Sequence, residues 1–148
     1  MVVLEIPSDY GYVLLAAASS TFVNMWHSSR VSKFRYASGV AYPNAYASAE
    51  EAKEGTLAYR FNCAQRAHSN FTENLTPFLA SLLIAGLRFP LVSAGLGFGW
   101  FVGRIMYTVG YVGSGPKGRV AGAIVHNLCN LALSFTGAYA AFTLIQGQ

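Results

Sequence analysis

An arginine, an amide and a carboxylate follow one another at helical spacing in the middle of this chain. Arg66, Asn70 and Glu73 stand four and three residues apart, so on a helix they share one face. Cys63 and Pro77 extend the same stripe. Such a stripe suits a zwitterion, whose carboxylate would bind the arginine and whose ammonium would bind the glutamate. The same residues also fit a polar network that only holds the helix against its neighbours.

A second stripe combines an arginine with two tyrosines. Arg104, Tyr107 and Tyr111 follow at spacings of three and four residues, and two more arginines, Arg35 and Arg119, lie just beyond apolar stretches. Tyrosines at a membrane edge serve as interface anchors or donate hydrogen bonds to an anion. Arginines that converge with few acids nearby would attract an anionic ligand. They would also favour the thiolate form of a bound thiol.

Histidine and cysteine give no sign of a metal centre. His68 lies two residues after Arg66 and therefore faces another direction, towards a neighbouring helix or subunit. It has no evident partners for a metal site, so we expect no metal. Cys63 and Cys129 both fall within predicted membrane spans, which argues against a disulfide framework.

The composition indicates that lipid covers much of the protein. Of the 148 residues, 53% are apolar and only 11% are charged, against about 25% charged in an ordinary soluble domain. The net charge of +4 comes from scattered basic residues that flank apolar stretches. This distribution is typical of membrane-edge anchors, so we expect no nucleic-acid partner.

Four apolar stretches predict a single all-α domain over residues 1–148, built as a bundle of four transmembrane helices. The predicted spans cover residues 12–29, 58–87, 90–112 and 120–145. The connections at residues 38–55 and 113–118, with the helix ends beside them, carry most of the basic residues, whereas the connection at Arg88 carries one. The positive-inside rule therefore places the first and third connections in the cytosol.

A resemblance to a known family rests on residues 61–70, which read FNCAQRAHSN, followed by Glu73, Pro77 and Phe78. This stretch resembles the second helix of the membrane-associated proteins in eicosanoid and glutathione metabolism (MAPEG), and looks most like that of the type-3 microsomal glutathione S-transferases. Weaker matches run along the whole chain, at residues 9–15, 31–33, 42–43, 93–97, 102–104 and 110–111. The pattern Arg-Ala-His-x-Asn-x-x-Glu gives the resemblance most of its specificity.

The resemblance implies a homotrimer with glutathione, as co-substrate, at each subunit interface near the cytosolic face. Carried over residue by residue, it implies that one subunit binds glutathione through Arg66, Asn70, Glu73, Tyr107 and Tyr111. Arg35 and His68 would reach the same molecule from a neighbouring subunit, and Arg119 would stabilise its thiolate. The implied location is the endoplasmic reticulum membrane, as a multi-pass protein, with the mitochondrial outer membrane as an additional location.

Two positions depart from the leukotriene synthase branch of this family. That branch has an arginine where this chain has Gly118, so either Lys117 or Arg119 would take its role. The tyrosine that follows the glutamate in that branch is Asn74 here, which argues against a dedicated leukotriene C4 synthase.

Three functions fit the sequence. The first is an enzyme that joins glutathione to lipophilic electrophiles or uses it to reduce lipid hydroperoxides. The second is a non-catalytic protein that presents lipids, and the third is a structural four-helix subunit of a larger membrane complex. The chain keeps Arg66, Asn70, Glu73 and both tyrosines of the second stripe, and this favours the enzyme.

Overall fold

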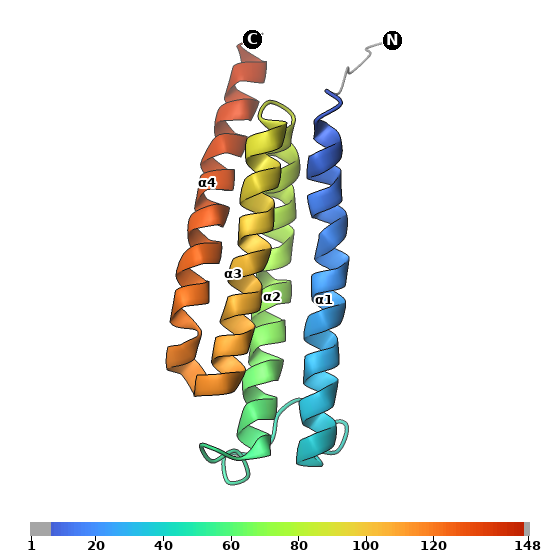
Figure 1. Cartoon of the computed structure of the whole chain (residues 1–148), viewed down its shortest axis with the longest axis vertical. Helices are drawn as coiled ribbons and strands as arrows, with labels where there is room; N and C mark the ends of the chain where they lie inside the picture. The colour runs from blue at the N-terminus through green and yellow to red at the C-terminus, as the bar shows by residue number, and fades with distance from the viewer. Residues whose placement is uncertain (1–6, 147–148) are drawn as a thin grey trace.

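The computed structural model describes residues 7–146 as four long helices (Figure 1). They are α1 (Tyr10–Ser38), α2 (Leu57–Gly86), α3 (Pro90–Gly118) and α4 (Val120–Ile145). The α1–α2 loop and the α3–α4 turn lie at the lower end of Figure 1, and the α2–α3 turn lies at the upper end. The predicted all-α, four-helix architecture is therefore confirmed for the described residues.

Local sequence explains where several helices begin and end. The Thr56 hydroxyl accepts a hydrogen bond of 3.1 Å from the backbone N–H of Tyr59, which caps the start of α2. Pro90 occupies the first turn of α3, where its missing N–H has no cost. Gly39 ends α1 with a left-handed φ of 71°, a conformation that glycine adopts readily.

Two helices extend beyond the stretches expected from the sequence. α1 continues to Ser38, well past residue 29. α3 continues to Gly118, although a break is expected over residues 113–118; its backbone departs from helical geometry only at Ser114 and Gly115. Gly115 has a φ of 68° and precedes Pro116, which disfavours a helical conformation in the residue before it. The expected break is therefore a sharp bend inside α3.

The outer surface of the bundle is apolar, whereas part of its interior is polar. Phe22, Leu128 and Phe135 are 72%, 62% and 69% exposed, while Arg104 and His126 are 0% and 4% exposed. A helix bundle in water shows the reverse arrangement, with its apolar stripe turned inwards. The observed arrangement suits an exterior that faces lipid chains.

Among the described helices, α4 alone is long and apolar enough to cross a membrane by length and composition, with a mean hydropathy of 1.5 in its most apolar window. The other helices alternate outward apolar residues with polar ones on inner or partly buried faces, such as Ser20, Asn24 and Asn70. These polar residues lower the mean hydropathy of their helices. The four predicted spans therefore have direct compositional support in α4 only.

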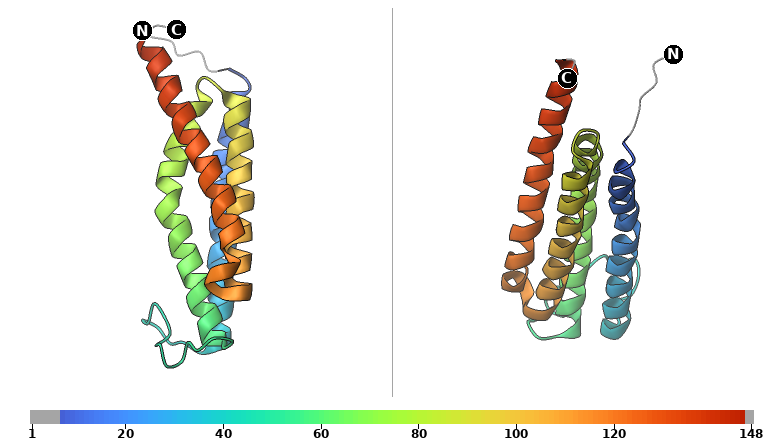
Figure 2. Two further views of the ribbon diagram at one scale, coloured as in Figure 1. Left: turned by 90° about the vertical axis from the view of Figure 1, so that its left-hand side faces the viewer. Right: turned by 45° about the horizontal axis from the view of Figure 1, so that its top comes forward.

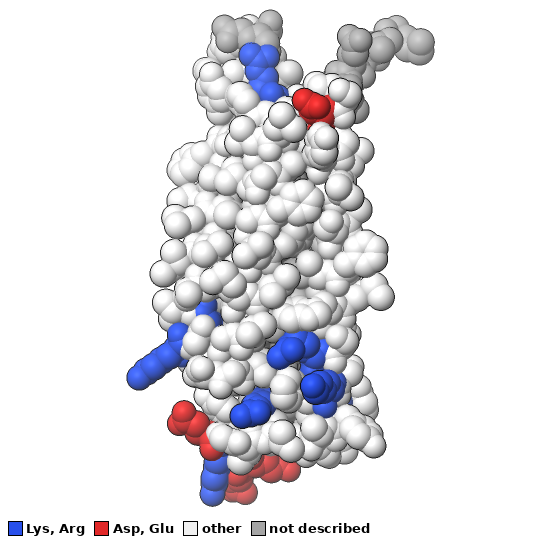
Figure 3. Space-filling view, viewed as in Figure 1, with Lys and Arg blue, Asp and Glu red and all other residues white. Residues whose placement is uncertain are grey.

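On the face drawn in Figure 3, charged side chains lie at both ends of the molecule, most of them at the lower end, and a broad uncharged band separates the two ends. The sequence accounts for this band, because Asp, Glu, Lys and Arg are absent from residues 10–29, 74–87, 89–103 and 120–146. At 1.5 Å of rise per residue these helical stretches measure roughly 20–40 Å. That length is comparable with a hydrocarbon layer of about 30 Å.

Close packing of α3 against α4 brings the polar interior together. A Cβ atom on Gly103 would lie 2.6 Å from the backbone nitrogen of His126, and one on Gly122 would overlap the backbone of Tyr107. Glycine at these positions thus permits the two helices to approach closely. Figure 2 shows that α4 is nevertheless inclined to α2 and α3, so it packs most closely along only part of its length.

Candidate functional site

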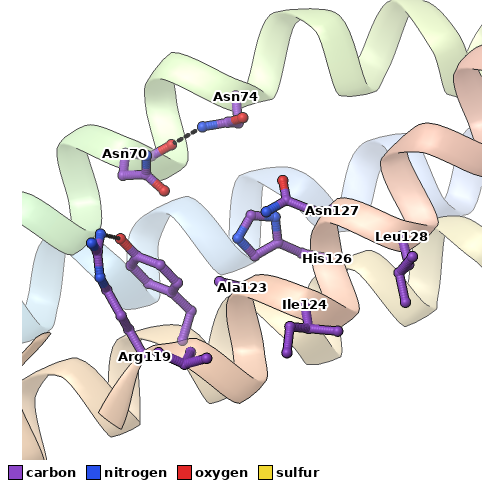
Figure 4. A pocket seen from close by; sticks show the side chains of 10 residues that line it. Asn70, Asn74, Arg119, Ala123, Ile124, His126, Asn127 and Leu128 are labelled. Carbon is purple, nitrogen blue, oxygen red and sulfur yellow. Dashed lines mark hydrogen bonds between the residues drawn. The ribbon is translucent and has the colours of Figure 1, made fainter. Parts of the chain in front are cut away.

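A cavity of about 520 Å³ lies between α2, α3 and α4 (Figure 4). Its size is within the range usual for small-molecule sites. The residues that line it are Asn70, Asn74, Tyr107, Arg119, Val120, Ala123, Ile124, His126, Asn127 and Leu128. Six of these residues are polar, and the apolar ones all come from α4. Ile124 and Leu128 are 56% and 62% exposed, so the apolar side of the cavity opens onto the surface of the bundle.

Arg119 and Tyr107 form the most strongly cationic part of the lining. Arg119 Nη1 donates a hydrogen bond of 2.9 Å to the Tyr107 hydroxyl, drawn as a dashed line in Figure 4. The guanidinium carbon also lies 5.2 Å from the centre of the Tyr111 ring. Because the Tyr107 hydroxyl accepts from Arg119, its own proton is available to donate to a ligand. Lys117 is exposed and is absent from the lining, so the geometry favours Arg119 over Lys117.

Arg66 and Glu73 form an ion pair on the outer face of α2. Arg66 Nη1 lies 2.9 Å from Glu73 Oε1, and the two side chains are 48% and 51% exposed. The predicted shared helix face is therefore confirmed for Arg66 and Glu73, because their side chains form an ion pair although they are seven residues apart on α2. An ion pair this exposed contributes only about 0–1 kcal/mol to stability. Neither residue lines the cavity.

Asn70 connects the cavity to the buried centre of the bundle. Its side-chain oxygen accepts a hydrogen bond of 2.9 Å from Arg104 Nη1, and the same nitrogen lies 3.1 Å from His126 Nε2. Arg104 is fully buried, with the rings of Phe71, Trp100 and Tyr107 at 5.1–5.7 Å from its guanidinium carbon. One arginine of α3 thus holds a side chain of α2 and a side chain of α4.

His68 lies on the side of α2 that packs against α1. Its Nε2 atom is 3.0 Å from Asn24 Oδ1, and its ring stacks on His27 with a centroid distance of 5.9 Å. Both partners belong to the same protomer. A contact between His68 and glutathione on a neighbouring subunit stays a prediction, and it would require the imidazole to use its other nitrogen.

Arg35 lies at the end of α1, in contact with the α1–α2 loop. Its Nη1 donates to the carbonyl oxygens of Val40 at 3.3 Å and Asn44 at 2.8 Å. Its guanidinium carbon lies 4.4 Å from the Tyr42 ring centre and 4.5 Å from that of Phe61. Within one protomer Arg35 fixes the loop and does not line the cavity, so its predicted role towards a neighbouring subunit stays a prediction.

The sequence reasoning left two central residues out of the site. Arg104 belongs to the arginines expected to attract an anionic ligand, but the sequence predicts no specific partner for it, and the predicted site does not include His126. A usable signal was present, since ionisable residues within membrane helices are costly and mark functional sites by default. The ionisable residues of α4 are His126, Cys129 and Tyr139.

Within residues 7–146, no group of three or more His, Cys, Asp or Glu side chains could hold a metal ion.

The arrangement combines hydrogen-bond donors with an apolar opening. Arg119, Tyr107 and Asn70 offer positive charge and N–H or O–H groups on one side, while Ile124 and Leu128 offer an apolar edge on the other. Such a cavity suits a polar, anionic molecule that meets a lipophilic one.

A comparison with known protein families finds that residues 13–139, most of the chain, match the MAPEG family.

Proposed function

The chain belongs to the MAPEG family, and on this basis we propose that it is a glutathione-dependent membrane enzyme of the transferase or peroxidase type. The family includes glutathione transferases, glutathione peroxidases and related enzymes. The observation that supports the proposal best is the cavity in which Arg119 and Tyr107 adjoin an apolar opening. The co-substrate is glutathione, and the second substrate is a lipophilic molecule that enters from the membrane.

The proposed chemistry begins with ionisation of the glutathione thiol. Arg119 stabilises the thiolate by its positive charge, and Tyr107 donates its hydroxyl proton in a hydrogen bond to the sulfur. In conjugation, the thiolate attacks an electrophilic carbon, a C–S bond forms and the leaving group departs with its electron pair. In peroxide reduction, the thiolate attacks the outer peroxide oxygen and an alcohol is released after protonation. A second glutathione then converts the sulfenic acid into glutathione disulfide and water.

Recognition of glutathione would use two of its charged groups, a carboxylate and the ammonium group. Arg66 would bind a carboxylate and Glu73 the ammonium group, at the edge of the cavity that Asn70 lines. Tyr111, whose ring lies at 5.7 Å from that of Tyr107, would complete this surface. In a homotrimer, Arg35 and His68 of a neighbouring subunit would add the remaining contacts.

The direct test is turnover by the purified protein in lipid vesicles. We expect glutathione-dependent conjugation of an aryl halide, reduction of a lipid hydroperoxide, or both, each above the rate in protein-free vesicles. A Tyr107→Phe variant should keep the fold and lose about tenfold in rate, since it removes one hydrogen bond of roughly 1–1.5 kcal/mol to the sulfur. Absence of both reactions, in protein that remains folded, would favour the lipid-presenting or structural alternatives.

The proposed topology has four membrane crossings in the endoplasmic reticulum membrane, with both basic connections in the cytosol. A cysteine placed at Ser48 or at Ser114 should then react with an impermeant reagent added to sealed microsomes. A cysteine at Arg88 should react only after the membrane is opened. Background from the native cysteines is removed by carrying out the labelling in a Cys63→Ala, Cys129→Ala chain. Protection of position 48 in sealed microsomes would reverse the orientation.

A further inference from the structure

Arg104 is buried without a carboxylate partner. It is fully buried, and the one ion pair among residues 7–146 joins Arg66 to Glu73. Its Nε and Nη2 atoms also have no hydrogen-bond partner in the described part of the chain. An isolated buried charge is destabilising, and an apolar side chain of similar volume is often as stable or more stable in its place. Packing alone therefore does not account for an arginine at this position.

The two hydrogen bonds that Arg104 does make have a fixed direction. A guanidinium group is donor-only, so Asn70 Oδ1 and His126 Nε2 must both act as acceptors. The side-chain oxygen of Asn70 therefore faces Arg104. Its second hydrogen-bonding group is the Nδ2 amide NH2, which is a donor. For His126, the fixed direction settles the tautomer, because an Nε2 acceptor requires the proton to sit on Nδ1.

Both of these partners line the cavity between α2 and α4. Figure 4 shows Asn70 on α2 facing His126 on α4 across the cavity. We propose that Arg104 is a positioning residue that turns Asn70 and His126 into hydrogen-bond donors, so that the inner wall of the cavity selects a carboxylate. That the carboxylate belongs to glutathione rests on the proposed function. The direction of the hydrogen bonds does not.

The buried charge strengthens the same preference. Arg104 and Arg119 both adjoin Tyr107, with guanidinium carbons 5.1 Å and 5.7 Å from the ring centre. Two cations thus lie close to one residue of the lining. A carboxylate held by Asn70 and His126 would supply the negative charge that Arg104 lacks within its own protomer. A carboxamide in place of the carboxylate would supply no negative charge. Its own N–H groups would also face the N–H donors of Asn70 and His126.

The matched variants are Arg104→Met, which removes the charge and both hydrogen bonds, and Arg88→Met, which makes the same change in the exposed α2–α3 turn. Methionine is expected to fold in the apolar surroundings of Arg104, and the melting temperature and oligomeric state check that it does. Arg104→Lys serves as the conservative variant, because it keeps the charge and can donate to one or both partners.

The first readout is the ¹⁵N spectrum of the histidine side chains at neutral pH, with the His126 signals assigned through His126→Gln. We expect the Nδ1-protonated tautomer in the wild-type and Arg88→Met proteins. In Arg104→Met the two tautomers should interconvert. An unchanged His126 tautomer in Arg104→Met would overturn the proposal. This readout does not depend on glutathione, so it decides the role of Arg104 even if the proposed function fails.

The second readout compares the affinities for glutathione and for its two monoamides, each with one carboxylate converted to a carboxamide. In the wild type, one monoamide should bind about tenfold or more weakly than glutathione, since a charge-assisted hydrogen bond is lost. Arg104→Met should weaken the binding of glutathione by a similar factor. It should weaken the binding of that monoamide by less than about threefold, because the freed Asn70 side chain can rotate and present its oxygen to the carboxamide. Arg104→Lys should recover part of the selectivity. An equal loss for all three ligands would reduce Arg104 to a structural role and contradict the proposal.

Discussion

Replacing Arg119 by alanine should lower the glutathione-dependent rate at pH 7 by about tenfold or more, with recovery as the pH rises. A free thiol has a pKa of about 8.5, and a positive charge within about 4–6 Å lowers the pKa of an acid by about 1–3 units. Arg119 lines the cavity and contacts the Tyr107 hydroxyl at 2.9 Å. Without it the thiol pKa rises, so the thiolate fraction at neutral pH falls and is regained in alkaline buffer.

The pH–rate profile distinguishes activation of the thiol from binding. Arg119→Ala should shift the rising limb of kcat to higher pH by one to two units and leave the affinity for glutathione largely intact. Lys53→Ala, an exposed charge in the α1–α2 loop, is the matched control and should leave the profile unchanged. If Lys117→Ala shifts the profile and Arg119→Ala does not, the activating cation is Lys117.

Replacing Arg66 or Glu73 by alanine should weaken glutathione binding by about 10- to 100-fold. Each change removes a charge-assisted hydrogen bond, which contributes roughly 1.5–3 kcal/mol. The thermal stability should change little, because the exposed Arg66–Glu73 pair contributes at most about 1 kcal/mol. Equilibrium titration measures the affinity, and Arg60→Ala provides the control, since Arg60 is an exposed basic residue of the same helix with no ion pair among residues 7–146.

A charge exchange separates recognition from structure at this pair. The double variant Arg66→Glu, Glu73→Arg can re-form the ion pair seen at 2.9 Å with its polarity reversed. If the pair only stabilises α2, the exchanged protein should behave as the wild type does. If it binds a zwitterion, the exchanged protein should fold normally and still bind glutathione weakly, since carboxylate and ammonium now meet the wrong partners. Normal binding by the exchanged protein would remove Arg66 and Glu73 from the site.

Long apolar stretches in the sequence were sufficient to predict the four helices, and helical spacing was sufficient to predict the shared face of Arg66, Asn70 and Glu73. Helical spacing depends only on the backbone, so it survives any arrangement of the bundle. The bend in α3 was harder to predict. Helical residues lie on both sides of Gly115, and the sequence fits a kink there as well as a loop between two helices. The spans of α1 to α3 also have weak compositional signals, since polar residues on inner faces offset the outward apolar ones.

The partners of individual side chains depend on how helices pack, and spacing along one helix does not contain that information. Asn70 was predicted to face a ligand, and it does line the cavity, but its oxygen is held by Arg104 from α3. Gly103 and Gly122 let α3 and α4 approach closely, and in this packing His126 lies beside Arg104. Arg35 and His68 have partners within their own protomer, and their predicted roles concern a second subunit.

Binding of glutathione to the purified wild-type protein tests the central claim most directly. The measurement is an equilibrium titration in detergent at neutral pH, with the ultraviolet absorbance of the thiolate recorded at each addition. We predict saturable binding together with a rise in thiolate absorbance, which Arg119→Ala should abolish while most of the binding remains. If glutathione shows no saturable binding to the folded wild-type protein, the glutathione-dependent function proposed for this chain is wrong.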